Sequence, residues 1–152
     1  MGGSSLAREF PRFTGESEHS LDEKGRLVVP ARYREALGPT FMVAAAPADP
    51  CLILYPIVAW ERVLQRLEDA ATKDGAYRRF RRRFLAQAED ASCDAQGRLV
   101  IPPRLRAVAG LEREAISIGA ISHVEIWNPT RLAAAQPTAE ENERLVAELR
   151  LD

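Results

Sequence analysis

Residues 22–34 read DEKGRLVVPARYR, and residues 94–106 read DAQGRLVIPPRLR. The two stretches are identical at eight of thirteen positions, and the offset between them is 72 residues. The same offset relates Gly38 to Gly110. Self-similarity at one fixed offset is the mark of a repeated structural unit. The chain is therefore interpreted as a tandem duplication, and we expect the two copies to pack together as one pseudo-twofold unit.

Each copy predicts the same order of elements: a strand, a tight turn, a strand, a short helix and two further strands. Gly25 and Gly97 mark the turns, because glycine adopts the positive φ that a tight turn needs. A proline then begins each short helix, and Gly38 or Gly110 ends it. The runs on either side of each turn are expected to pair as hairpin arms. The expected strands are 18–22, 26–29, 41–46 and 51–55 in the first copy and 92–94, 98–101, 115–119 and 123–127 in the second, with helices over 31–37 and 103–109.

Helical patterns separate and follow the two copies. Apolar residues at helical spacing predict a helix over 57–71, and a second helix is predicted over 76–88 after a Lys-Asp-Gly break. A further, acidic helix is predicted over 138–149. These patterns divide the chain into a flexible N-terminal extension, a first repeat, a helical connector, a second repeat and a C-terminal helical tail. The corresponding ranges are 1–12, 13–56, 57–90, 91–128 and 129–152.

The amino-acid composition argues against several classes of protein. A formal net charge of -1 argues against a protein that coats nucleic acid by bulk attraction, so any nucleic-acid binding depends on local patches. Two cysteines are too few for a disulfide framework, and two histidines without a Cys/His cluster do not suggest a zinc site. We expect no metal and no cofactor. We also expect no signal peptide and no membrane span, and hence a cytoplasmic protein.

The repeated pattern Asp-x-x-Gly-Arg, followed by an apolar run, Pro and a further Arg, resembles the AbrB-like, swapped-hairpin superfamily of DNA-binding proteins. Two such copies with a helical insert after the first resemble the MraZ family, over residues 13–127. This resemblance implies an α+β, mainly β, pseudo-twofold swapped-hairpin β-barrel built from two tandem repeats. It also implies a ring-shaped homo-oligomer, an octamer or a dodecamer. The implied role is a nucleoid-associated autorepressor of a bacterial division and cell-wall gene cluster that binds short direct repeats in its own double-stranded promoter DNA.

The resemblance also assigns roles to the two loops. Lys24, Arg26 and Arg98 are implied as DNA contacts, and Gln96 stands where the first copy has its lysine. An arginine fork can donate two hydrogen bonds to guanine, whereas a lysine suits phosphate. The loop-structuring residues are Asp22, Gly25, Asp94 and Gly97. A purely structural alternative stays open, in which each Asp and Arg pair as opposite charges and hold the turn together.

Other residues have two interpretations each. Arginines on the short helices (Arg32, Arg34, Arg104 and Arg106) suit structural ion pairs, with phosphate contact as the alternative. The arginine-rich run 78–83 suits a solvated helix face, with DNA contact as the alternative. Aromatic residues beside strand ends (Tyr55, Trp60 and Trp127) suit core or subunit-interface packing rather than base stacking. Cys51 and Cys93 suit small buried residues rather than redox sensors.

The two loop aspartates also bear on an enzymatic alternative. Asp22 and Asp94 are symmetry-related carboxylates, as in aspartic proteases, but Glu23 and Ala95 follow them where those enzymes have Thr or Ser. A neighbouring arginine would also keep each carboxylate ionised, which a shared-proton dyad does not allow. We therefore predict no enzymatic activity and no catalytic residue. An antitoxin-like protein that binds a toxin partner and DNA is the main alternative, and a purely structural ring is another.

Overall fold

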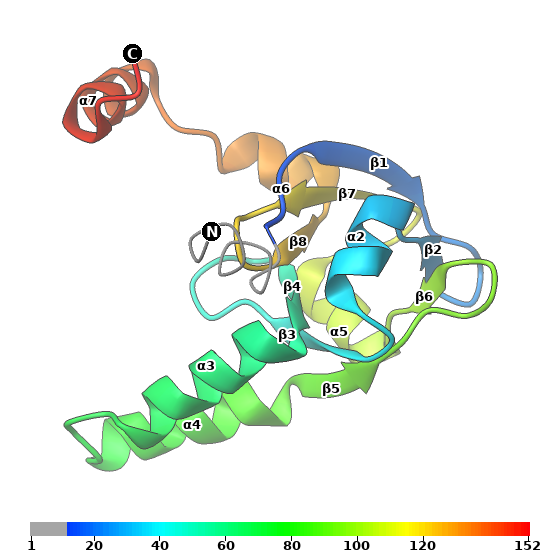
Figure 1. The fold of residues 1–152 in the computed structure, drawn as a ribbon, viewed down its shortest axis with the longest axis horizontal. Helices are drawn as coiled ribbons and strands as arrows, with labels where there is room; N and C mark the ends of the chain where they lie inside the picture. The colour runs from blue at the N-terminus through cyan, green and yellow to red at the C-terminus, as the bar shows by residue number, and fades with distance from the viewer. Residues whose placement is uncertain (1–11) are drawn as a thin grey trace, which may run out of the picture.

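The computed structural model describes residues 12–152, which form an α+β unit dominated by antiparallel sheet (Figure 1). The first repeat contains β1 (Glu16–Ser20), β2 (Arg26–Val28), α2 (Ala31–Leu37), β3 (Phe41–Ala45) and β4 (Leu52–Pro56). The second contains β5 (Ala88–Ala91), β6 (Arg98–Val100), α5 (Pro103–Ala109), β7 (Glu114–Gly119) and β8 (Val124–Trp127). Both short helices have the predicted bounds, because a proline precedes each helix and a glycine with positive φ follows it. The expectation of a flexible extension falls almost entirely on residues outside the described range.

The two repeats exchange strands. One sheet has the order β1-β7-β8-β4-β3-β5, and β2 pairs with β6 in a separate two-stranded ribbon. The first strand of each repeat therefore pairs with a strand of the other: β1 with β7 of the second repeat, and β5 with β3 of the first. The prediction that β1 and β2 pair as hairpin arms was wrong. An isolated hairpin is marginal in water, whereas cross-repeat pairing of β1 and of the ribbon encloses a shared core.

Two further expectations differ from the structure. The strand expected over 92–94 was wrong: β5 lies earlier, at Ala88–Ala91, and Cys93 makes only an isolated bridge with Leu99. The helix expected to reach residue 88 ends at Ala86, since Gln87 closes it and the chain turns into β5. Within residues 12–152 the closed barrel is not confirmed, because β1 and β5 are the two edges of an open sheet.

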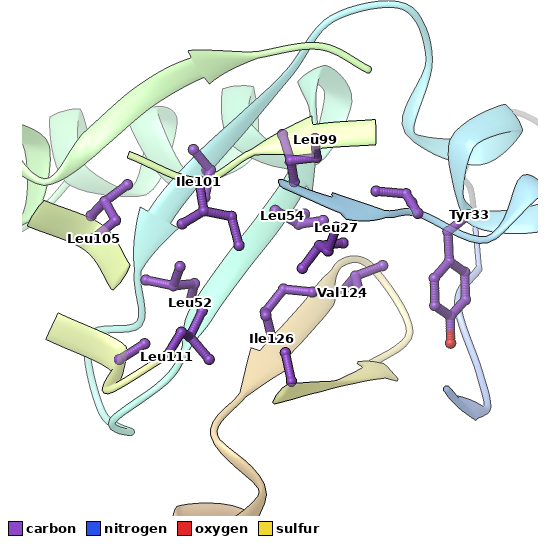
Figure 2. Packing of buried hydrophobic residues seen from close by; sticks show 14 of the residues in the cluster. Leu27, Tyr33, Leu52, Leu54, Leu99, Ile101, Leu105, Leu111, Val124 and Ile126 are labelled. Atoms are coloured by element: carbon purple, nitrogen blue, oxygen red, sulfur yellow. The ribbon is translucent and has the colours of Figure 1, made fainter. Parts of the chain in front are cut away.

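The main core lies between the sheet and the ribbon, and both repeats contribute to it (Figure 2). Leu27 on β2 and Leu99 on β6 are each 1% exposed and meet residues from the large sheet, among them Leu54 and Ile126. Tyr33 on α2 also donates hydrogen bonds from its hydroxyl to the backbone carbonyls of Thr14 (2.8 Å) and Gly15 (2.9 Å). The core thus fixes the ribbon to the sheet. Burial of the three aromatic residues beside strand ends confirms their packing role; they are Tyr55, Trp60 and Trp127.

The helical connector forms a hairpin of α3 (Ile57–Glu68) and α4 (Gly75–Ala86). Its α3 ends three residues before the predicted bound, and Asp74 caps α4 by accepting a hydrogen bond from the Tyr77 amide at 2.9 Å. The Tyr77 hydroxyl donates to the Leu67 carbonyl and joins the two helices. After β8 come α6 (Pro129–Ala134) and α7 (Ala139–Leu149). Figure 1 shows the α3–α4 hairpin and α7 on the side of the molecule away from β2 and β6.

Both cysteines are free thiols. Burial raises the pKa of Cys51 to about 12 and also raises the pKa of Cys93, so both remain protonated near neutral pH. This agrees with their interpretation as small packed residues.

In the described part of the chain, no helix has the length and apolar character to cross a bilayer. Over the same residues, no cluster of three or more His, Cys, Asp or Glu side chains is suited to hold a metal ion.

Candidate nucleic-acid interface

The first loop is organised by Asp22. One carboxylate oxygen, Oδ1, accepts hydrogen bonds from the backbone amides of Lys24 and Arg26, both at 2.9 Å. The other, Oδ2, accepts from Arg26 Nε at 2.6 Å, which forms an ion pair. The Asp22 amide and the Arg26 carbonyl close the loop at 3.0 Å. Asp22 therefore both shapes the turn and fixes the Nε edge of the Arg26 guanidinium.

The second loop repeats this geometry at Asp94. Its Oδ1 accepts from the amides of Gln96 and Arg98 at 2.9 Å, and its Oδ2 lies 2.7 Å from Arg98 Nε. One contact has no counterpart in the first loop, because Arg98 Nη2 donates to Gln96 Oε1 at 3.3 Å. Lys24 holds the equivalent position, and an ammonium group cannot accept a hydrogen bond. The two arginines are thus oriented alike, but Arg98 is held at one additional atom.

Both carboxylates are held ionised by their surroundings. Hydrogen bonds from the backbone amide of the loop arginine, with further help from its guanidinium, lower the pKa of Asp22 and of Asp94 below the ordinary value of 3.8. An ionised Asp keeps its Arg oriented across the physiological pH range. Each carboxylate has its own arginine partner, so neither is in the state of a shared-proton dyad. The opposite-charge pairing of Asp and Arg, left open from sequence as a structural alternative, is present in both loops.

The glycine of each loop lies against an arginine of the other repeat. Gly25 has φ +75°, and a Cβ placed there would lie 2.5 Å from Arg106 Nε on α5. Gly97 has φ +78°, and its Cβ would lie 2.6 Å from Arg34 Nη1 on α2. A Cβ at either position would displace the end of that arginine side chain, and the positive φ is strained for any other residue, so both positions favour glycine. Each loop therefore rests on a guanidinium supplied by the opposite repeat.

Backbone hydrogen bonds reinforce this exchange. The Val29 amide donates to the Gly97 carbonyl at 2.9 Å, and the Ile101 amide donates to the Gly25 carbonyl at 3.0 Å. The loop of one repeat is in this way tied to the strand end of the other. The result is a single rigid surface rather than two independent turns.

The short ribbon joins the two loops. In its register, Arg26 faces Val100 and Val28 faces Arg98. Side chains alternate along a strand, and Leu27 and Leu99 point into the core, so these four residues share the outer face. Val28 and Val100 are each 54% exposed. The outer face thus presents two pairs across the ribbon, each an exposed valine opposite an oriented arginine. Figure 1 shows both loops together at this end of the molecule.

The arginines outside the loops take different places. The prediction of a structural ion pair is confirmed for Arg104, whose guanidinium is 3.2 Å from the Glu89 carboxylate. Arg32 instead lies over the Tyr33 ring, 4.7 Å from its centroid, and donates a hydrogen bond to Ser17 Oγ at 3.5 Å. Ion pairing was the wrong prediction for Arg34 and Arg106, which support the loop glycines. All residues of the run 78–83 are exposed, and α4 lies away from the β2–β6 ribbon in Figure 1.

Sequence reasoning missed four residues of this surface: Arg34, Arg106, Val28 and Val100. The repeat held a signal for the two arginines, because both copies keep Arg four residues after the proline. The valines could be found by alternation alone, since each lies two residues after a loop arginine. Together with Lys24 and the loop arginines, the supporting arginines make the positive side chains of this surface outnumber its acidic ones.

Comparison with known proteins agrees with this architecture. The MraZ protein family, described as antitoxin-like, matches residues 12–83 and again residues 84–150. A "Transcriptional regulator MraZ" from Thermomicrobium roseum is 44% identical over 122 residues, which cover 80% of this chain and 85% of the relative. A protein of the same name from Pediococcus pentosaceus is 39% identical over 140 residues, 92% of this chain and 97% of the relative. A third, from Pelotomaculum thermopropionicum, is 46% identical over 115 residues, with coverage of 76% and 79%. The chain belongs to the MraZ family.

Proposed function

We propose that this protein is a DNA-binding transcriptional regulator that contacts promoter DNA with the outer face of the β2–β6 ribbon and its two loops. The observation that carries the proposal is the pair of Asp–Arg contacts, which orient two arginines on one exposed face. The relatives' name as transcriptional regulators supports the same role. Strand exchange between the repeats, with β1 on β7 and β5 on β3, supports placing the unit in the swapped-hairpin superfamily.

The chemistry of the face suits sequence reading. Asp22 and Asp94 accept from the Nε atoms of Arg26 and Arg98, so the terminal nitrogens of Arg26 can donate to guanine O6 and N7. Arg98 can make the same two-bond contact once its Nη2 gives up the hydrogen bond to Gln96 Oε1. Lys24 is a mobile point charge at the tip of the first loop and suits a phosphate. Gln96 offers both a donor and an acceptor to a base or phosphate. Val28 and Val100 place methyl groups where thymine methyls can be contacted.

One such face makes too few contacts for tight specific binding. We infer that several copies act together in a ring, an octamer or a dodecamer, and that successive faces occupy short direct repeats. Simultaneous engagement raises the overall affinity without any new contact. The regulated promoter in this proposal is the protein's own, at the head of a division and cell-wall gene cluster, and the regulation is repression. The site of action is then the nucleoid, in the cytoplasm.

Binding to the DNA upstream of the protein's own gene tests the proposal. Wild type, Arg26→Ala and Arg98→Ala are titrated against this fragment and against a scrambled fragment over a series of salt concentrations. The affinity of each variant for the promoter fragment should be about 5- to 160-fold lower than that of wild type, because each substitution removes a two-bond base contact worth about 1–3 kcal/mol. Light scattering would show that the oligomer is unchanged.

Arg104→Ala is the matched control, because it removes an arginine whose contacts are with Glu89 and the Ala86 carbonyl. It should bind the fragment as wild type does. If Arg26→Ala and Arg98→Ala both retain specific binding, or if wild type shows none, the loops do not read DNA and the proposal fails.

A further inference from the structure

The acidic helix α7 buries no side chain within the described chain, residues 12–152, although it is well formed. A capping box fixes its start: Thr138 Oγ1 accepts from the Glu141 amide at 3.0 Å, and Glu141 Oε1 accepts from the Thr138 amide at 2.8 Å. Every residue of the helix is nevertheless at least partly exposed. A helix of this length is marginal in water when it buries no apolar face. Its stability therefore calls for a surface to pack against.

One side of α7 is suited to such packing. Leu145, Val146 and Leu149 lie at spacings of one and four residues and form an apolar stripe, and Leu149 is 62% exposed. Glu141, Glu143 and Glu148 flank this stripe, roughly a quarter to a third of a turn from its centre. Figure 1 shows α7 at the end of an extended segment, clear of the sheet and of the other helices. The stripe is thus a contact surface whose partner lies outside this copy.

A groove on the helical connector has the matching chemistry. It lies between α3 and α4 and has a volume of about 400 Å³. Its lining includes Val63 and Leu67 from α3 and Phe80 and Phe84 from α4. Phe80 is 48% exposed and stacks on Phe84 with ring centroids 5.9 Å apart. The groove therefore presents an open apolar floor, the kind of surface against which an amphipathic helix packs.

The charges around the groove complement those of α7. The helix α4 carries five arginines and no acidic residue, and Arg66 adds a positive charge at the rim. By contrast α7 carries four glutamates and one arginine. Complementary charge at the rim of an apolar contact favours the correct partner and orientation. The charges nearest the two apolar faces are the glutamates at 141, 143 and 148 on α7 and the arginines at 81 and 83, which flank Phe80 and Phe84 on α4.

We propose that α7 of one copy occupies the α3–α4 groove of a second copy of this chain. The two surfaces differ, so the contact is head-to-tail, and each copy still offers one groove and one helix to further copies. Head-to-tail contacts close into rings when the rotation between copies allows it. This inference rests on the oligomer of the proposed function and assigns the surfaces that hold it together. The same interface keeps the DNA-facing ribbon of every copy open, because α7 and the α3–α4 hairpin lie on the side of the molecule away from β2 and β6 (Figure 1).

A mixing experiment tests the contact. Leu145→Asp places a charge in the stripe of α7, and Phe80→Asp places one in the groove of α4. Both side chains are well exposed, so circular dichroism and thermal unfolding should show intact folds. Each variant alone should elute as a monomer under conditions in which wild type is an oligomer. A 1:1 mixture should form dimers, because the Phe80→Asp copy supplies a normal α7 and the Leu145→Asp copy supplies a normal groove.

Val100→Asp is the matched control, because Val100 is similarly exposed but lies on the ribbon. It should keep the oligomer and lose DNA binding. The inference is overturned if Leu145→Asp and Phe80→Asp both keep the wild-type oligomer, or if the mixed monomers fail to associate. It is also overturned if wild type is monomeric, with α7 in its own groove. Oligomeric state is measured without DNA, so a failure here leaves the proposed DNA contacts to be judged by their own titration.

Discussion

The two loops share the same Asp–Arg hydrogen-bond geometry and differ in the side chains beside it. In both, an aspartate binds two backbone amides and the Nε atom of an arginine four residues later. The first loop adds Lys24, whereas the second adds Gln96, which accepts from Arg98 at 3.3 Å. The arginines that pack against the two loop glycines differ as well. Arg106 Nε donates to the Ile101 carbonyl at 3.1 Å, but Arg34 Nε is buried without a hydrogen-bond partner among the described residues. The duplication has kept the geometry that aims the arginines, while the charge at the loop tips has diverged.

The largest expected effect tests whether both loops read bases. Arg26→Lys and Arg98→Lys keep the positive charge but remove the planar fork, so discrimination between promoter and scrambled DNA should fall by about 1–3 kcal/mol for each base pair that is read. Binding to scrambled DNA should change little. Titration of both DNA fragments by fluorescence anisotropy measures this. Loss of discrimination in Arg26→Lys alone would mean that the second loop has only a structural role.

The next effect concerns the packing of each loop glycine against an arginine of the other repeat. Gly25→Ala and Gly97→Ala should each lower the free energy of unfolding by about 1–3 kcal/mol, because the new methyl group meets Arg106 or Arg34 at a strained positive φ. Denaturant unfolding measures the change, and Glu23→Ala, which is exposed in the same loop, is the control. Combining Gly25→Ala with Arg106→Ala should cost less than the sum of the two single changes. Strict additivity would contradict the cross-repeat contact.

A smaller effect tests the divergence of charge. Lys24→Gln should reduce the slope of log affinity against log salt concentration by about one unit for each phosphate contact that is lost. Gln96→Lys should increase this slope, because it adds a positive charge at the tip of the second loop. Exchanging both residues at once should leave the slope near that of wild type. A slope that stays constant in both single variants would show that the loop tips do not touch phosphate.

The smallest effect is on the pH dependence of stability. Burial lowers the pKa of His19, which is 2.7 Å from Ser117 Oγ on β7, and also lowers that of His123. Because the unfolded chain then binds more protons, the free energy of unfolding should fall as the pH drops from about 7.5 to about 5.5. His19→Gln should flatten this decline, as measured by denaturant unfolding at several pH values. A stability that rises over this interval would contradict the assignment.

Local features of this fold could be predicted from sequence, but pairing partners could not. The proline and glycine around 31–37 and 103–109 define both short helices, and the Asp–Arg spacing predicted the ion pairs in the loops. Apolar alternation identifies a strand without saying which strand it joins. Exchange of β1 and β5 between repeats is decided by the shared core, which involves residues far apart in the chain.

The same limit applies to the candidate site. Arg26 and Arg98 could be placed where each loop ends and the next strand begins, because the turn is local. The positions of Arg34 and Arg106 could not be predicted, because each contacts the loop of the opposite repeat. Their positions two residues beyond another helical arginine gave no indication of which arginine points toward a loop and which toward the surface.

Arginine footprinting tests most directly whether the two loops form one DNA-binding face. The protein is treated with an arginine-selective dicarbonyl reagent, alone and with promoter DNA, and each modified peptide is quantified by mass spectrometry. We predict that promoter DNA protects Arg26 and Arg98 together, while exposed Arg144 on α7 keeps its reactivity. Unchanged reactivity at both loop arginines, with protection of the arginines on α4 instead, would contradict the assignment of the ribbon and place the DNA on the helical connector.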